Sequence, residues 1–267
     1  AGIAAGISAV FRTPLGAALL AVEILYRDGF ESDALIPSVF ASVISYSVVI
    51  SIFGESTLFA VGQGFPFIPR HLPYYAALAI VIALGSVAFL QALGAMRNFS
   101  SRFPGPGWLR PAWGGLVLGL MVSAVLYLTG RAGVDHGLGL LGGGYGAVQA
   151  AISGASWLGE GWRAVVILAL MAVGKIIAAS ITLGSGGSAG DFAPSLAIGG
   201  LIGGAFGTAA QLLFEDPSLQ PAAFALVGMG AFYGGIAHVP LASLVLVCEL
   251  AGNYDLLVPL MLVQGIV

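Results

Sequence analysis

Long apolar stretches follow one another along almost the whole chain. They cover residues 1–26, 34–53, 74–96, 111–129, 163–183, 192–213, 222–250 and 255–267. Charged residues make up only 8% of the 267 residues, whereas soluble domains carry roughly 25%. A membrane-spanning helix needs about 20 predominantly apolar residues and satisfies its own backbone polar groups. The sequence therefore predicts an all-α, polytopic integral membrane protein.

The charged and metal-ligating residues exclude several classes of function. A formal net charge of −3 leaves no basic surface for nucleic acid. Cys248 is the only cysteine, so neither a disulfide framework nor a cysteine-based zinc site is available. The three histidines are too widely spaced for a zinc constellation. We therefore expect no metal, no cofactor and no nucleic-acid partner.

Residues 184–194 form a polar, glycine-rich break between two apolar stretches. Irregular backbone at membrane depth must line a cavity enclosed by protein or filled with water. The run from Phe192 to Leu213 predicts a helix with Pro194 in its first turn. A helix start carries unpaired N–H groups and about half a positive charge. Aimed inward, this start is an anion site; the alternative is a plain turn between two membrane helices.

An internal repeat links the two ends of the chain, because residues 2–23 and 228–249 match in the same register. The matching positions are Gly2 and Gly228, Ala5 and Ala231, Pro14-Leu15 and Pro240-Leu241, Leu20 and Leu246, and Glu23 and Glu249. Each copy predicts a helix, a break at the Pro-Leu pair, and a second helix that ends at the glutamate. Such repeats are typical of transporter folds with an inverted-repeat architecture and broken, tilted helices.

The repeat also suggests how the chain is divided. It opens in apolar sequence at Ala1, and the run after Asp255 stops at Val267, short of the roughly 20 residues of a span. We expect both ends to be cut inside membrane elements of a longer protein. Residues 1–53 are predicted to end a first membrane repeat. Residues 74–267 are predicted to form most of a second repeat, truncated at its C-terminus.

Several motifs match one family in order along nearly the whole chain. The run Gly190-Asp191-Phe192-Ala193-Pro194 matches a Gly-x-Phe-x-Pro motif. Further matches are Gly2 to Pro14-Leu15 with Glu23, and then Ala225–Ala231, Pro240-Leu241, Glu249 and Asn253-Tyr254. In these motifs the chain resembles the CLC family of chloride channels and chloride/proton antiporters.

The resemblance implies an anion site built from the backbone N–H groups of Asp191, Phe192 and Ala193, with Gly190 and Pro194 forming the loop and helix start. Chloride is then the bound substrate ion, with no other cofactor. The family's other anion contacts, on a serine loop, a gating-glutamate loop and a tyrosine of the last helix, fall outside this sequence. Asp191 departs from the family, which usually has an apolar residue there. Its charge is favourable at a helix start when the carboxylate points to water.

Three residues outside the motif leave alternatives open. Lys175 lies where the family often has a basic residue, and a lysine in an apolar helix either is functional or snorkels to an interface. Glu23, like Glu249, is either a proton-pathway group or a helix-end cap. The resemblance puts the antiporters' internal proton-transfer glutamate at Ile24, which cannot carry a proton. This favours a voltage- or anion-gated chloride channel; the alternative is a chloride/proton antiporter.

A remote alternative is an intramembrane serine hydrolase, with Ser185 or Ser188 as nucleophile and His238 as base. Nothing in the spacing of these residues indicates such a dyad, and we expect a protein that is not an enzyme. The resemblance implies a homodimer that meets through helices matching residues 10–53 and 240–267. We therefore expect a multi-pass protein in contact with lipid, in the inner membrane of a bacterium.

Overall fold

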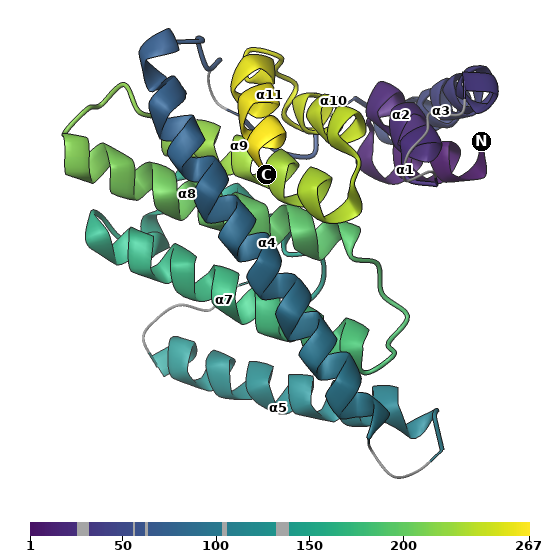
Figure 1. The fold of residues 1–267 in the computed structure, drawn as a ribbon, viewed down its shortest axis with the longest axis vertical. Helices are drawn as coiled ribbons and strands as arrows, with labels where there is room; N and C mark the ends of the chain where they lie inside the picture. The colour runs from purple at the N-terminus through teal and green to yellow at the C-terminus, as the bar shows by residue number, and fades with distance from the viewer. Residues whose placement is uncertain (26–31, 56, 62–63, 103–105, 132–138) are drawn as a thin grey trace.

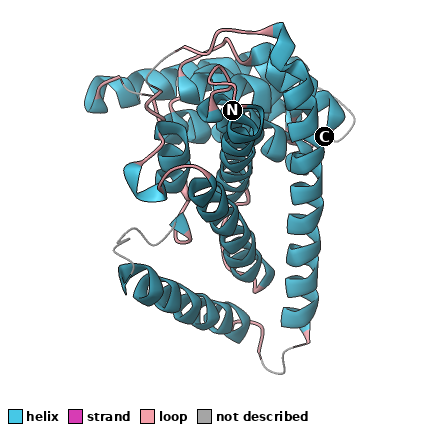
Figure 2. Cartoon of the chain, turned by 90° about the vertical axis from the view of Figure 1, so that its left-hand side faces the viewer, coloured by secondary structure: helices cyan, strands magenta, loops and turns pink. Residues whose placement is uncertain are grey.

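A computed structural model describes the protein at residues 1–25, 32–55, 57–61, 64–102, 106–131 and 139–267. All regular structure in these ranges is helical (Figure 1; Figure 2). The elements are α1 (Gly2–Phe11), α2 (Pro14–Glu23), α3 (Ser32–Phe53), η1 (Pro69–His71), α4 (Leu72–Ser101), α5 (Leu109–Arg131), α6 (Tyr145–Ser153), η3 (Ser156–Leu158), α7 (Trp162–Gly184), α8 (Phe192–Phe214), α9 (Pro221–Ala237), α10 (Pro240–Ala251) and α11 (Leu257–Ile266). The predicted all-α fold is confirmed.

Five described segments are helical, long and apolar enough to cross a membrane, as expected for a multi-pass protein. They are Asp33–Phe53, Pro69–Ser101, Leu109–Gly130, Trp162–Gly184 and Phe192–Phe214. Helices α1, α2, α9, α10 and α11 are apolar but have only 10–17 residues. The apolar stretches 1–26 and 222–250 therefore each contain a pair of short helices rather than one long one.

The breaks in these two stretches have the same geometry. Arg12 between α1 and α2 has φ 58°, and His238 between α9 and α10 has φ 56°, so both adopt the left-handed conformation. Pro14 and Pro240 then begin the second helix of each pair. Proline removes the backbone donor and cannot continue the preceding helix. The predicted breaks at the Pro-Leu pairs are confirmed, and they fall at matching positions of the repeat.

Helices α2 and α10 cap each other's N-termini. The Glu249 carboxylate, near the end of α10, accepts hydrogen bonds from the amides of Leu15 (3.0 Å) and Gly16 (2.7 Å) in the first turn of α2. The Glu23 carboxylate, at the end of α2, accepts hydrogen bonds from the matching amides of α10 at 3.2 and 2.7 Å. The two copies of the repeat thus meet in a reciprocal contact, as an approximate two-fold relation requires.

The remaining helices form a layer crossed by α4. Helix α8 packs between α7 and α9, and α4 contacts all three while crossing them diagonally (Figure 1). Helices α1, α2 and α3 pack together at one side of this layer, where α2 contacts α10. Helix α5 contacts α7 near the opposite edge of the layer. Helix α8 is therefore packed against several neighbours, while residues 188–191 just before its first turn are exposed.

Glycines let α8 and α9 approach closely. A Cβ atom on Gly199 would overlap the Gly228 carbonyl, and one on Gly203 would overlap the Phe224 carbonyl. Small residues at helix contacts are the usual means of close packing in membranes, where no hydrophobic effect drives helices together. This contact fixes the register of α8 against α9 and so decides which α9 residues lie beside the start of α8.

Candidate anion site

The N-terminus of α8 is the centre of the candidate site. Its N-cap residue, Asp191, makes no side-chain capping hydrogen bond. The first backbone hydrogen bond runs from the Ser195 amide to the Asp191 carbonyl (3.0 Å). Among the hydrogen bonds of the described residues, none uses the amides of Asp191, Phe192 or Ala193. These amides and the helix dipole are therefore free to hold an anion.

The loop before α8 turns sharply because of its glycines. Gly186 has φ 89°, a conformation that residues with a Cβ atom rarely adopt. The Gly187 amide donates to the Thr182 carbonyl (3.0 Å) and holds the loop against the end of α7. The chain can thus leave α7 and begin α8 after a short connection with an exposed Gly190.

A cavity of about 340 Å³ lies beside this helix start, and Gly190, Ala193 and Pro194 line it together with Lys175 and the 140–143 segment. The Lys175 side chain is only 2% exposed. Its ammonium donates to the carbonyls of Leu140 (3.2 Å) and Gly142 (2.7 Å). The structure thus buries Lys175 beside the cavity and does not extend it to the surface. A buried ammonium favours a negatively charged occupant.

The Phe192 side chain does not line this cavity and packs in a row of aromatic rings. Its ring centroid lies 4.7 Å from that of Tyr233 on α9 and 4.6 Å from that of Phe11 on α1, both in edge contacts. Phe11 in turn contacts Tyr145 of α6 at 6.1 Å. The sequence analysis missed Tyr233, Phe11 and Tyr145, because an isolated aromatic residue in an apolar helix carries no signal of its partners.

Asp191, Glu23 and Ile24 have different surroundings, although the carboxylates of Asp191 and Glu23 both lie near Tyr233 of α9. Asp191 is exposed and forms no ion pair with Lys175. Glu23 is engaged with the first turn of α10, as described above. Ile24 follows it at the end of α2 with 41% of its surface exposed. Of these three residues, Asp191 alone belongs to the start of α8.

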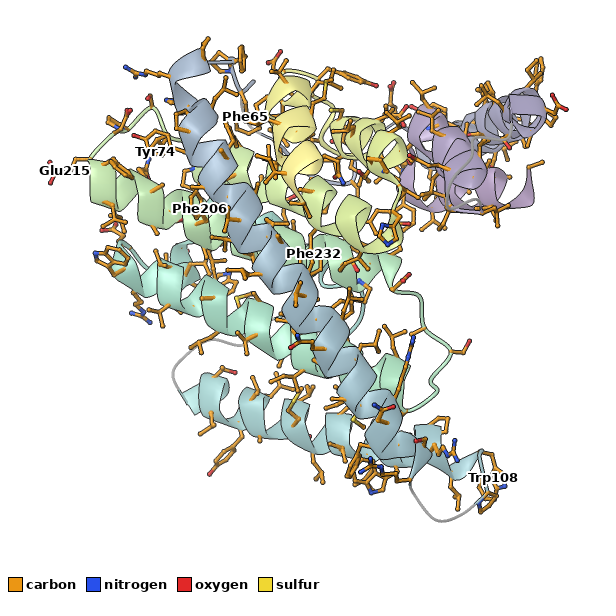
Figure 3. The ribbon with its side chains drawn as sticks, viewed as in Figure 1. Phe65, Tyr74, Trp108, Phe206, Glu215 and Phe232 are labelled. Atoms are coloured by element: carbon orange, nitrogen blue, oxygen red, sulfur yellow. The ribbon has the colours of Figure 1, made fainter. Side chains whose placement is uncertain are left out.

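The geometry gives no support to a serine hydrolase. The Ser185 hydroxyl donates to the Thr182 carbonyl at 3.2 Å. No hydrogen bond in the described part of the chain joins His238 to Ser185 or to Ser188. Glu215, labelled in Figure 3, follows the last turn of α8 and so lies at the end of this helix opposite the candidate site.

These features define the class of protein: an all-helical, multi-pass membrane protein in which a broken-helix repeat flanks an uncapped helix start. A sequence model of the family described as voltage gated chloride channel matches residues 1–266, and the chain belongs to this family. The resemblance drawn from the motifs is confirmed, and so is the expectation that the chain is not an enzyme.

Among curated proteins, the chain is 30% identical over 260 residues to the "H(+)/Cl(-) exchange transporter ClcA" of Yersinia pestis bv. Antiqua (strain Angola). It is 31% identical over 266 residues to the protein of the same name from Salmonella agona (strain SL483). These alignments cover 97% and 98% of the chain but 51% and 52% of the relatives. The chain thus spans about half the length of the curated relatives it matches.

Two solved structures share the fold. A slow cyanobacterial Cl−/H+ antiporter superposes with a TM-score of 0.77 at 23% identity, over 98% of this chain and 58% of that one. A CLC-type fluoride/proton antiporter superposes with a TM-score of 0.75 at 22% identity, over 99% of this chain and 60% of that one. At these identities the likeness shows the fold alone.

Proposed function

We propose that the full-length protein carries chloride or a similar small anion across a membrane, and that the start of α8 forms part of its anion site. One observation carries this proposal: the amides of Asp191, Phe192 and Ala193 are unused at an uncapped helix start. The start begins a long apolar helix and adjoins a cavity with a buried ammonium. Moving an anion into an apolar interior costs tens of kcal/mol in the Born limit, so aligned backbone dipoles must replace its water.

Bromide tests the position of the site, because it resembles chloride and is visible by anomalous scattering. Crystals of the full-length protein soaked in bromide are expected to give density within about 4 Å of the Phe192 amide, a generous limit for such a hydrogen bond. Bromide bound elsewhere in the membrane region, with none beside Phe192, would contradict the proposal.

The mode of transport we propose is exchange of the anion for protons. The curated relatives reported above are named as H+/Cl− exchangers and the similar structures as antiporters. Ile24 pointed the sequence analysis to a channel, since its side chain carries no proton. The names of these relatives outweigh that single position, because a proton can be carried by other groups of the full-length protein.

Glu23 is a poor candidate for such a group. Its carboxylate accepts two backbone hydrogen bonds from α10, and these fix its position. Glu249 makes the same contacts with α2 and serves as a matched control. If both glutamates act as caps, the Glu23→Gln and Glu249→Gln variants will affect proton coupling to the same extent.

Vesicles that contain the full-length protein separate these possibilities. A chloride gradient is expected to drive protons uphill, recorded as a change of internal pH, in the wild type and in both glutamine variants. Chloride flux without proton movement in the wild type would favour the channel. Loss of proton movement in Glu23→Gln alone would assign Glu23 to the proton path.

Residues 1–53 and 74–267 are proposed to belong to two membrane repeats, and the matching breaks and reciprocal caps support this division.

We also propose a homodimer through residues 10–53 and 240–267, in a bacterial inner membrane. Helix α3 lies in the first of these ranges and has a strongly apolar exposed face that a second protomer can cover, made of Ile36, Phe40, Val43, Ile44, Val48, Ile52 and Phe53. A protein mass of one protomer for the full-length protein in mild detergent would contradict the dimer.

A further inference from the structure

Tyr233 is a buried tyrosine whose hydroxyl has no partner. Its side chain is 2% exposed, and no hydrogen bond among the described residues involves it. Tyrosines in protein interiors usually find a hydrogen-bond partner. The Tyr233 hydroxyl is not among the fully buried polar atoms without a partner in the described residues, so it keeps some accessible surface and can take a partner from outside the described chain.

The side chain lies beside the start of α8. Its ring makes an edge contact with the ring of Phe192, with 4.7 Å between centroids and an interplanar angle of 84°. The carboxylates of Asp191 and Glu23 are close enough to act electrostatically on the Tyr233 hydroxyl. The ring of Tyr233 thus lies against Phe192, and the amides of residues 191–192 are unused.

Close packing restricts the Tyr233 side chain to its position beside Phe192. Gly199 and Gly228 bring the backbones of α8 and α9 into direct contact, about two turns from Phe192 and a little over one turn from Tyr233 respectively. The ring of Phe192 is also held from its other side by Phe11, at 4.6 Å. Packing of this kind fixes the side chain and leaves the hydroxyl in one position.

The groups assembled there are hydrogen-bond donors. Backbone amides donate only, and a neutral phenol can donate. The neighbouring Glu23 carboxylate already accepts hydrogen bonds from two amides of α10, and Asp191 is exposed. A water molecule must donate as well as accept, whereas a small anion accepts from every side.

We propose that the Tyr233 hydroxyl is a further ligand of the anion at the start of α8, to which it donates a hydrogen bond alongside the amides of Phe192 and its neighbours. This assignment rests on the proposed function of the same helix start. It adds a side chain to a site otherwise built from backbone, and a side chain can be changed without moving the helix.

The test compares two phenylalanine variants of the full-length protein. Tyr233→Phe removes the hydroxyl at the site. Tyr75→Phe is the matched control, because Tyr75 on α4 is also buried, at 6% exposure, and stacks on Phe224 of α9 at 4.6 Å, near the other end of that helix. Chloride and bromide affinities are measured by calorimetry in detergent, and melting temperatures with and without chloride.

We expect Tyr233→Phe to weaken anion binding about tenfold, the effect of losing one hydrogen bond to a charged group. Tyr75→Phe should leave the affinity unchanged. Without chloride, Tyr233→Phe should be as stable as the wild type or more stable, since it loses an unpaired hydroxyl. Chloride should raise its melting temperature less than that of the wild type.

Two results would overturn the assignment. Unchanged affinity in Tyr233→Phe would exclude the hydroxyl as a ligand. Equal destabilisation with and without chloride would mean that another part of the full-length protein pairs with it. Bromide density in wild-type crystals keeps these outcomes separate from failure of the proposed function: density beside the Phe192 amide leaves the site intact, and its absence there removes the site itself.

Discussion

The N-termini of α2 and α10 differ from the N-terminus of α8 in one respect, although all three begin apolar helices whose first amides have no acceptor within the helix. The first turn of α2 receives the Glu249 carboxylate and that of α10 receives Glu23. The start of α8 receives no carboxylate from the described chain, and its own Asp191 makes no capping hydrogen bond. Carboxylates of the chain itself thus occupy the N-termini of α2 and α10, whereas the N-terminus of α8 has no such carboxylate in the described residues.

This difference separates a structural use of the helix dipole from a binding use. A carboxylate of the same chain stabilises the fold permanently, whereas an open start exchanges its anion. Both uses follow from the same unpaired amides and the same partial charge. The neighbours distinguish them, because the capped starts face each other and the open one faces a cavity with Lys175.

The largest loss of stability is expected from separating α8 and α9, which would disrupt the uncapped N-terminus of α8. A Cβ on Gly203 would overlap the Phe224 carbonyl, so Gly203→Val should cost about 3 kcal/mol or more through overpacking. Gly119→Val is the control, since nothing lies within 4 Å of a Cβ there. Size-exclusion chromatography in detergent should show a folded peak for Gly119→Val and a much reduced one for Gly203→Val.

The next largest loss of stability is expected at the N-termini of α2 and α10, which Glu249 and Glu23 cap. Removing either carboxylate leaves two amides unpaired, and each of Glu23→Ala and Glu249→Ala should cost about 2 kcal/mol or more, because hydrogen bonds to charged groups are the strong ones. Glu160→Ala, at an exposed position, should cost little. Thermal unfolding in detergent measures all three. A large cost for one cap and none for the other would contradict the reciprocal arrangement.

The capping contacts of Glu23 and Glu249 could not be predicted from the sequence, whereas the breaks between the helices could. The Pro-Leu breaks and the left-handed Arg12 and His238 are local features, so the pattern predicted the two short helices of each copy. It left capping by Glu23 and Glu249 open, since the receiving helix lies more than two hundred residues away. Such contacts depend on the tertiary fold and leave no trace in spacing.

The same limit applies to the candidate site. The Gly-x-Phe-x-Pro run identified the helix start, because a glycine-rich loop and an early proline are local signals. The burial of Lys175 against two carbonyls and the contact of Tyr233 with Phe192 arise from the packing of α7, α8 and α9. Neither could be predicted from residues that are far apart along the chain.

A smaller effect is expected at the open start itself. Asp191 places a negative charge beside the proposed anion, and at this exposed position the repulsion is worth about 1 kcal/mol. Asp191→Asn should therefore tighten chloride binding about fivefold. Glu215→Gln, at the other end of α8 (Figure 3), should leave the affinity unchanged. Calorimetry on the full-length protein measures both, and weaker binding by Asp191→Asn would mean that the carboxylate supports the site.

The smallest effect is expected in the loop between α8 and α9, where a carboxylate again bonds to its own chain. The hydroxyl and amide of Ser218 donate to Asp216 at 2.6 and 2.9 Å. These hydrogen bonds, with the nearby charge of Arg70, hold the pKa of Asp216 below its usual 3.8. A lowered pKa in the folded protein means that the contribution to stability is complete above the usual value and is lost as the pH falls through the folded value.

Asp216→Asn should therefore be slightly less stable than the wild type at neutral pH, and the difference should shrink below about pH 3.8. The effect is small because the carboxylate is at the surface and solvent screens it. Melting temperatures of both proteins across this range measure it. A difference that stays constant down to the lowest pH would show that the aspartate contributes by shape and not by charge. The contrast with α2 and α10 would then be sharper, because only their caps would depend on a carboxylate charge.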